Sequence, residues 1–155
     1  MKKTITAFER ATNYLGIRSR TVKEMHIYLV GKGYSLSDIA GAIEKLLEYG
    51  YLNDSEFASE YVESYKHKYG PAKIRHGLIR LGVERGLIDV ALEDLGEQRE
   101  EAESIAERYL RGRELDYELK QKLTRHLASK GFCWDTVKAV SDKLQESKKK
   151  KKATH

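Results

Sequence analysis

The stretch VKEMHIYLVGKGY at residues 22–34 recurs in pattern twice more, as PAKIRHGLIRLGV at 71–83 and as KQKLTRHLASKGF at 120–132. The three glycines Gly33, Gly82 and Gly131 each lie 49 residues from the next. The same interval aligns apolar residues around them: Met25 with Ile74 and Leu123, Leu29 with Leu78 and Leu127, and Tyr34 with Val83 and Phe132. A fixed period of this size indicates a repeated supersecondary unit.

The glycine marks the end of a helix in each copy. Apolar residues recur at helical spacing before it, so a glycine is expected at the left-handed position that follows a helix C-terminus. Lys32 and Lys130 precede two of the glycines, which suits a helix C-terminus. After the first glycine, Ser35 and Asp38 form an N-cap pair for the next helix. The only proline, Pro71, suits the first position of the middle glycine helix.

A further apolar stripe lies upstream of each glycine helix, so each unit reads as helix, helix, glycine turn, helix. Between the second and third units this first stripe aligns with an offset near 44, which predicts a loop of variable length. We therefore expect an all-α chain of about nine helices without a sheet. A unit of about 45 residues is too small to fold alone, so the units should stack into an elongated, curved array. The predicted ranges are 4–52, 53–95 and 96–146 for the repeats and 147–155 for a disordered basic tail.

The charge of the chain is concentrated at its C-terminal end. Lys148 to Lys152 account for the whole net charge of +5, because the remainder has 24 basic and 24 acidic side chains. The tail has no apolar residues to fold with, and it either contacts phosphate or only improves solubility. Cys133 is the single cysteine, which favours a reducing compartment, and no apolar run suits a signal peptide or a membrane span. We expect a cytoplasmic monomer.

The body of the chain is neutral but unevenly charged. Residues 66–82 contain five basic residues and no acid, and the glycine helices of the other units are also basic. The helices after the glycines are acidic instead. A basic stripe beside an acidic edge is one interpretation, and solvation of exposed helix faces is the other. The candidate contact residues are Lys66, Lys68, Tyr69, Lys73, Arg75 and Arg80 in the middle unit, Arg18, Arg20 and Lys23 in the first, and Lys120, Lys122 and Arg125 in the third.

The sequence contains no catalytic signature, since it lacks a phosphate loop, H-E-x-x-H, G-x-S-x-G and paired cysteines. We expect no enzyme, no metal and no cofactor. Cys133 is interpreted as a semi-buried packing residue rather than a nucleophile. Tyr69 lies in a loop between basic residues, where it either stacks on a base or partner or braces the loop.

The middle unit resembles a known family. LNDSEFASEYV at 52–62 is similar to the L-D/N-D-x-x-F-A-x-x-Y/F-V stretch of the RecX regulators, and KYGPAKIRHGL at 68–78 to their G-Y-G-P-x-R/K-I-x-x-E-L stretch. Weaker similarity extends over about residues 6–146. Two residues depart from the pattern: Leu81 replaces a lysine, and Gly77 replaces a glutamate at a cost of about 1 kcal/mol in helix propensity.

The resemblance implies a bacterial protein that binds the RecA filament on single-stranded DNA, and duplex DNA weakly. Such proteins lie along the filament groove and usually inhibit filament extension, ATP hydrolysis, strand exchange and LexA cleavage in recombination and the SOS response. Two alternatives compete with this hypothesis. Three-helix units with a glycine turn also resemble helix-turn-helix modules that bind DNA without RecA. A purely structural repeat scaffold is the other.

Overall fold

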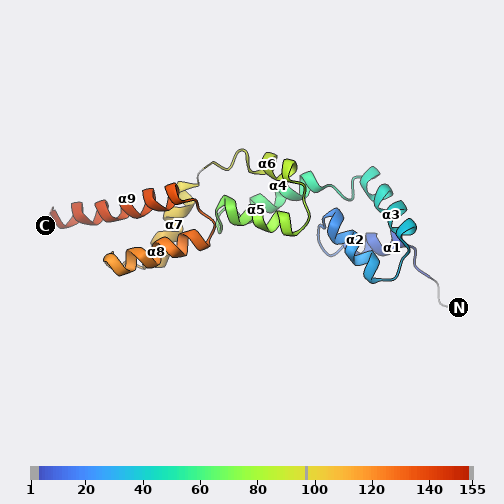
Figure 1. The fold of residues 1–155 in the computed structure, drawn as a ribbon, viewed down its shortest axis with the longest axis horizontal. Coiled ribbons are helices and arrows are strands. Elements are labelled where there is room, and N and C mark those ends of the chain that lie inside the picture. Colours follow the sequence, from blue (N-terminus) through green and yellow to red (C-terminus); the bar gives the residue numbers. More distant parts are fainter. Residues whose placement is uncertain (1–3, 97, 154–155) are drawn as a thin grey trace. The chain divides into compact units, whose positions relative to one another are not determined.

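The computed structural model describes residues 4–96 and 98–153 of the 155-residue chain. Within this part the chain forms nine helices and no strand, which confirms the all-α prediction (Figure 1). The helices are α1 Ala7–Leu15, α2 Val22–Gly31, α3 Leu36–Glu48, α4 Asp54–Tyr65, α5 Pro71–Arg80, α6 Arg85–Leu92, α7 Arg99–Leu110, α8 Tyr117–Ser129 and α9 Trp134–Ala153. They follow one another as three repeats of three helices.

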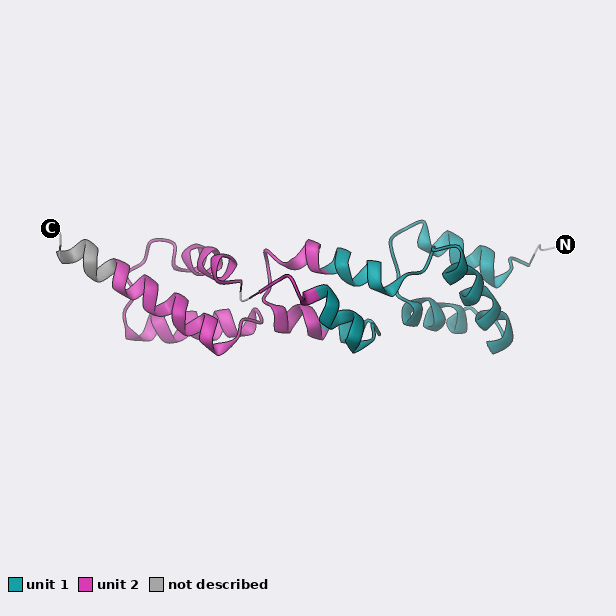
Figure 2. Cartoon of the chain, turned by 90° about the horizontal axis from the view of Figure 1, so that it is seen from above, with its two compact units in different colours: residues 1–61, 77–91 teal, residues 62–76, 92–155 magenta. Residues whose placement is uncertain are grey.

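The chain divides into two compact units, coloured separately in Figure 2. Unit 1 comprises residues 1–61 and 77–91, and unit 2 comprises residues 62–76 and 92–155. The middle repeat therefore contributes helices to both units, while the first repeat belongs to unit 1 and the third to unit 2. The elongated, curved arrangement of the repeats stays a prediction.

The core of the first repeat is built from one apolar stripe on each of its helices. Met25 and Leu29 of α2 are fully buried, together with Ile39 and Leu46 of α3. Small residues of α1, such as Ala11, let the helices approach closely. The residues that the 49-residue register aligns are therefore the ones that lose their apolar surface to the core, which is the main stabilising term.

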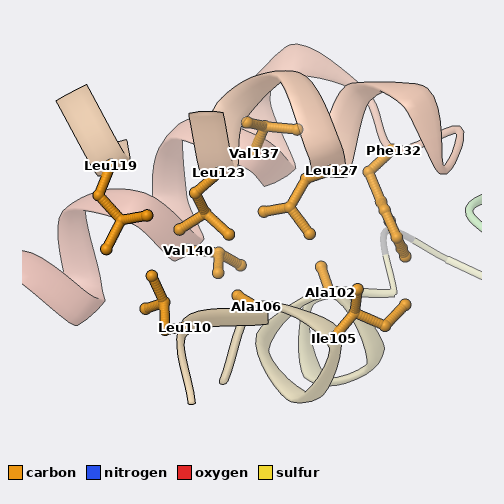
Figure 3. Packing of buried hydrophobic residues seen from close by; sticks show 10 residues of the cluster. All are labelled: Ala102, Ile105, Ala106, Leu110, Leu119, Leu123, Leu127, Phe132, Val137 and Val140. Carbon is orange, nitrogen blue, oxygen red and sulfur yellow. The ribbon is translucent and has the colours of Figure 1, made fainter. Parts of the chain in front are cut away.

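The third repeat repeats this design in unit 2. Nine buried residues of α7, α8 and α9 and Phe132, from the turn between α8 and α9, form one core (Figure 3). Leu119, Leu123 and Leu127 line one face of α8 at spacings of four residues, as a helix buried along one stripe requires. Val137 and Val140 of α9 face them.

The three register glycines end their helices in the same way. Their φ angles are +87° at Gly33, +90° at Gly82 and +95° at Gly131, a region that favours glycine. In each repeat the residue after the glycine donates its N–H to a carbonyl five positions back: Tyr34 to Leu29, Val83 to Leu78 and Phe132 to Leu127. This bond and the left-handed glycine define a Schellman motif, as the sequence predicts.

Two of these turns also lie against the first residues of a helix from the preceding repeat: the turn at Gly82 against α2, and the turn at Gly131 against α5. In unit 1 a Cβ at Gly82 would collide with the side chain of Lys23. In unit 2 a Cβ at Gly131 would lie 2.5 Å from the backbone nitrogen of Lys73. Gly33 has a similar φ, but a Cβ there would meet nothing within 4 Å. The glycine period therefore meets two requirements, a left-handed turn and a close approach between consecutive repeats.

A hydrogen bond accompanies each close approach. In unit 1 the hydroxyl of Thr21, the N-cap of α2, donates to the Leu81 carbonyl at 2.6 Å. In unit 2 the N–H of Gly70 donates to the Lys130 carbonyl at 2.7 Å. Thr21 and Gly70 occupy the same register position. A Cβ at Gly70 would collide with the Gly131 carbonyl, which explains why glycine stands where the first repeat has threonine.

Tyr28, Gly77 and His126 are also 49 residues apart, and each lies opposite the first helix of its repeat. Tyr28 stacks on Tyr14 with ring centroids 3.7 Å apart, and His126 stacks on Tyr109 at 4.4 Å. The middle counterpart is Gly77, where a Cβ would collide with the hydroxyl of Tyr61. The space of the missing side chain at Gly77 is therefore taken by the tyrosine, which explains this departure from the family pattern.

These contacts correct the predicted alignment of the first helices. Tyr61 and Tyr109 play the same part, so α4 and α7 correspond with an offset of 48 rather than 44. The buried pairs agree, since Ala58 matches Ala106 and Val62 matches Leu110. The two offsets differ by about one helical turn, and an apolar stripe looks similar after such a shift.

Replacing Gly77 by alanine is expected to stabilise the chain by less than its helix propensity suggests. The change gains about 1 kcal/mol of propensity, but the new Cβ must displace the Tyr61 hydroxyl. Adding Tyr61→Phe should restore most of the gain. Gly41→Ala is the matched control, because Gly41 lies inside α3 with nothing within 4 Å. Urea unfolding of the single and double variants measures this coupling, and strict additivity would contradict it.

Two expectations about the C-terminal region were wrong. The helix α9 continues to Ala153, so residues 147–153 are helical rather than without regular structure. Lysine is a good helix former, and no glycine or proline interrupts the chain after Trp134. Residues 154 and 155 lie outside the described part.

Cys133 is exposed rather than semi-buried. It occupies the register position of Ser35, directly before a helix, so the expected packing role does not apply. Its Sγ lies 3.2 Å from Thr136 Oγ1, and this hydrogen bond is the main cause that lowers the pKa of the thiol. Among the helices of the described residues, none is long and apolar enough to cross a membrane.

Candidate nucleic-acid interface

Unit 2 contains a cleft of about 310 Å³. It lies between the loop that follows α4, in the second repeat, and the helices of the third repeat. Its residues come from the loop after α4, from α7 and from the C-terminal end of α8. They are Lys68, Tyr69, Ile105, Arg108, Tyr109, His126 and Lys130, and we refer to them as the cationic cleft.

The loop reaches this position because its backbone is fixed to the third repeat. Gly70 donates to the Lys130 carbonyl, and the N–H of Ala72 donates to the Gly131 carbonyl at 3.1 Å. Both bonds lie beside Tyr69 in sequence, so they set the direction in which its ring points. The alternative that Tyr69 braces the loop thus has a structural basis, although backbone bonds do most of the bracing.

The Tyr69 ring is half-buried between two lysines. The ammonium of Lys73 lies 4.3 Å from the ring centroid and that of Lys130 lies 5.3 Å from it. Tyr65 is the aromatic neighbour, at 5.8 Å between centroids. Each cation gains about 0.5–1 kcal/mol over an exposed ring, which holds the ammonium groups near the cleft.

The charge of the cleft is of one sign. Lys68, Arg108 and Lys130 line it, and no carboxylate is among the residues that do. Tyrosine and histidine rings provide flat surfaces next to these cations. A groove that combines cations with rings can bind phosphates and stack bases without reading sequence, as proteins that bind single-stranded nucleic acid do.

His126 is the group of the cleft whose charge responds to pH. Burial lowers the pKa of its imidazole below the ordinary value, and the neighbouring Lys130 cation lowers it further. Its ring stacks on Tyr109, and the other cleft cations are Lys68 and Arg108. Near neutral pH the imidazole is therefore neutral in the free protein, and an anion that enters the cleft favours its protonation.

We expect the affinity for single-stranded DNA to rise several-fold as the pH falls from 7.5 to 5.5. Because the folded pKa of His126 is lowered, its contribution to stability is fully present above the unfolded pKa, about 6.5, and is lost as pH falls through the folded pKa. His126→Phe keeps an aromatic ring without a titrating group, so it should reduce the pH dependence of both the DNA affinity and the stability. His67 lies outside the cleft, with its Nδ1 3.4 Å from a carboxylate oxygen of Glu101, so His67→Gln is the control. Fluorescence anisotropy with an oligothymidylate, together with thermal unfolding, measures both. An unchanged pH dependence in His126→Phe would assign the titration to another group.

The other predicted contact residues of unit 2 differ in how exposed they are and in whether an acidic side chain pairs with them. Lys73 is exposed and lies over Tyr69, while Lys66 pairs with Glu63 at 2.9 Å and Arg75 is half-buried. On α8, Lys120 is held by Asp142 at 3.2 Å and is not a free cation. Lys122 and Arg125 are exposed on the same helix, outside the cleft.

The predicted residues of unit 1 are partly neutralised within the fold. Arg18 and Arg20 share Glu24, with N–O distances of 2.7 Å and 3.9 Å. Arg20 also lies 3.9 Å over the Tyr14 ring, and its side chain is 10% exposed, so it has a packing role. Lys23 and Arg80 are exposed. A basic stripe through all three repeats stays a prediction.

Five residues of the cleft were not among the predicted contact residues: Ile105, Arg108, Tyr109, His126 and Lys130. Lys130 could have been found from the sequence, because it directly precedes the register glycine Gly131. The turn at Gly131 contacts the preceding repeat, and the Lys130 carbonyl accepts a hydrogen bond from Gly70 there. Arg108 and Tyr109 lie on α7, far from the acid-free segment in sequence, so no local pattern connects them with Tyr69. His126 has no local sequence signal, because its place in the cleft depends on its stack on Tyr109.

Tandem three-helix repeats define this chain as an all-α repeat protein, with a cation-lined cleft in unit 2. Comparison with known proteins specifies the family. The models of the first, second and third three-helix domains of RecX match residues 7–46, 53–92 and 97–140. The chain belongs to the RecX family.

Relatives in several bacteria carry the name Regulatory protein RecX. The protein of Bacillus subtilis is 35% identical over 144 residues, which cover 89% of this chain and 54% of that protein. That of Clostridium tetani is 31% identical and covers 81% of this chain and 61% of its own length. The chain thus spans between about half and three-fifths of the length of these relatives.

A solved structure agrees with the family assignment. The crystal structure of RecX from Lactobacillus salivarius superposes with a TM-score of 0.81 at 25% sequence identity. The match covers 89% of this chain and 94% of the other. The three tandem domains predicted from the 49-residue register are therefore confirmed.

Proposed function

We propose that this chain binds the filament that the RecA recombinase forms on single-stranded DNA, and that it slows ATP hydrolysis, strand exchange and coprotease activity by the filament. It acts as a cytoplasmic monomer without catalysis of its own. In recombination and in the SOS response, its effect is to limit how long an active filament persists.

The cationic cleft is the observation that carries this proposal. A filament of recombinase on single-stranded DNA presents phosphates and bases beside protein. A cleft with Lys68, Arg108 and Lys130 around the Tyr69 ring offers complementary charge and a stacking surface for that DNA. Membership of a family whose members are named regulatory proteins agrees with a role in binding rather than in catalysis.

DNA binding without RecA is the competing hypothesis. In the first repeat, Arg18 and Arg20 precede α2 and are paired with Glu24. Their charge is thus less available for base edges than a recognition helix in the major groove requires.

Biolayer interferometry on immobilised single-stranded DNA tests the proposal. The chain should bind DNA coated with RecA and a slowly hydrolysed ATP analogue at least about tenfold more tightly than bare DNA. Immobilised duplex without RecA is the comparison. Equal affinity for bare and coated DNA would refute the proposal, and tighter binding to duplex would favour the competing hypothesis.

A further inference from the structure

A second hollow of unit 2 lies on the other side of α8, between this helix and α9. Its volume is about 530 Å³, and its lining includes Tyr117, Arg125 and Trp134. None of its lining residues belongs to the cationic cleft. We refer to it as the α8–α9 groove.

Two large rings of the groove are exposed to water. Tyr117 is 76% exposed and Trp134 is 65% exposed. Single exposed apolar residues are ordinary, but here two rings lie in one hollow beside an arginine. Tryptophan, tyrosine and arginine are the residues that most often dominate the energy of protein–protein interfaces.

The charge of the groove differs from that of the cleft. The ammonium of Lys120 is bound by Asp142 at 3.2 Å and by Gln145 Oε1 at 2.8 Å, so its charge is compensated within the fold. Arg125 has no carboxylate partner in the part of the chain that the structure describes. The groove therefore presents one available cation beside apolar rings, whereas the cleft presents three cations.

This difference decides which partner fits. A nucleic-acid strand carries one phosphate per nucleotide and gains affinity from several uncompensated cations, which the groove lacks. An acidic protein segment needs only an apolar anchor for the rings and one carboxylate for Arg125. The rings alone would suit either partner, so the small number of uncompensated cations is what favours protein over DNA.

We propose that the α8–α9 groove docks an acidic segment of a partner protein, with an apolar side chain against Trp134 and Tyr117 and a carboxylate on Arg125. This proposal rests on the proposed function, so the partner is the recombinase in the filament rather than its DNA. The two sides of α8 then have different roles, DNA contact in the cleft and protein contact in the groove.

Trp134 provides a direct probe because it is the only tryptophan of the chain. Incorporation of 5-fluorotryptophan gives a single ¹⁹F resonance from the full chain. This resonance should shift or broaden on addition of RecA filaments assembled on single-stranded DNA with a slowly hydrolysed ATP analogue. It should stay unchanged on addition of the same DNA without RecA, at concentrations where anisotropy shows the chain bound.

Variants separate the two partners. Trp134→Ala with Arg125→Glu should weaken filament binding at least about tenfold and leave affinity for bare DNA within about twofold. Val90→Ser is the matched control, because Val90 is also 65% exposed but lies on α6. Circular dichroism checks that each variant stays helical, which is expected because these side chains are exposed.

Each outcome decides the proposal. A resonance shift with DNA alone would make the groove a DNA site and overturn the protein-docking role. Filament binding without any change at Trp134, or with full affinity in the double variant, would overturn it while leaving the proposed function intact. Absence of binding to the filament would refute the proposed function and this inference together.

Discussion

Reversal of charge at Lys68, Arg108 and Lys130 to glutamate is expected to abolish the effect of this chain on RecA and to remove most of its affinity for single-stranded DNA. The three side chains line one cleft without a compensating carboxylate, so their reversal replaces attraction for phosphate by repulsion. If each cation neutralises one phosphate, the slope of log affinity against log salt should flatten by about 2.

A salt titration of DNA binding by anisotropy measures both quantities. The control is a triple variant with the same change in net charge outside the cleft, Lys45→Glu, Arg85→Glu and Lys138→Glu, all at exposed positions. Because long-range electrostatics depends on net charge, this control should lose some affinity but keep its slope. Equal losses in both triple variants would mean that net charge, not the cleft, binds DNA.

Replacement of Gly131 by alanine is expected to destabilise the chain by more than about 3 kcal/mol, whereas Gly33→Ala should cost about 1–2 kcal/mol. Both glycines have a left-handed φ, +95° and +87°. Only at Gly131 would the new Cβ also lie 2.5 Å from the Lys73 backbone nitrogen, where no side-chain movement can relieve the contact. The difference between the free energies of unfolding of the two variants therefore measures the contact between Gly131 and Lys73.

Urea denaturation of both variants, followed by far-ultraviolet circular dichroism, gives the two free energies of unfolding. Lys73→Ala serves as a further control, because it removes a side chain at the joint but leaves the backbone contact unchanged. Equal destabilisation by Gly33→Ala and Gly131→Ala would show that backbone conformation alone explains the glycine period.

The 49-residue register predicted the features of the fold that depend on local sequence. The left-handed glycines, the N-cap at Ser35 and the helix start at Pro71 each follow from a few neighbouring residues. The joint between Lys73 and Gly131 could not be predicted in this way, since it connects residues that are distant in sequence. The 49-residue spacing of the glycines does not show whether glycine is needed for a left-handed φ angle or for close contact with a neighbouring repeat.

The candidate site was predicted in part for the same reason. Lys68 and Tyr69 lie in an acid-free segment that is visible in sequence, and the structure places both in the cleft. The roles of Arg20 and Lys120 depend on tertiary contacts, a stack on Tyr14 and a pair with Asp142, so net charge per helix overestimates the cations available. Arg108 and Tyr109 were missed because their place beside Tyr69 depends on the tertiary contact between α7 and the loop after α4.

The most direct measurement of the central claim is ATP hydrolysis by RecA on single-stranded DNA with increasing amounts of this chain. We predict that the wild-type chain lowers the steady-state rate, that the cleft variant with Lys68, Arg108 and Lys130 reversed leaves it unchanged, and that the matched exposed-charge variant lowers it almost as the wild type does. An unchanged rate with the wild-type chain, or full inhibition by the well-folded cleft variant, would contradict the account.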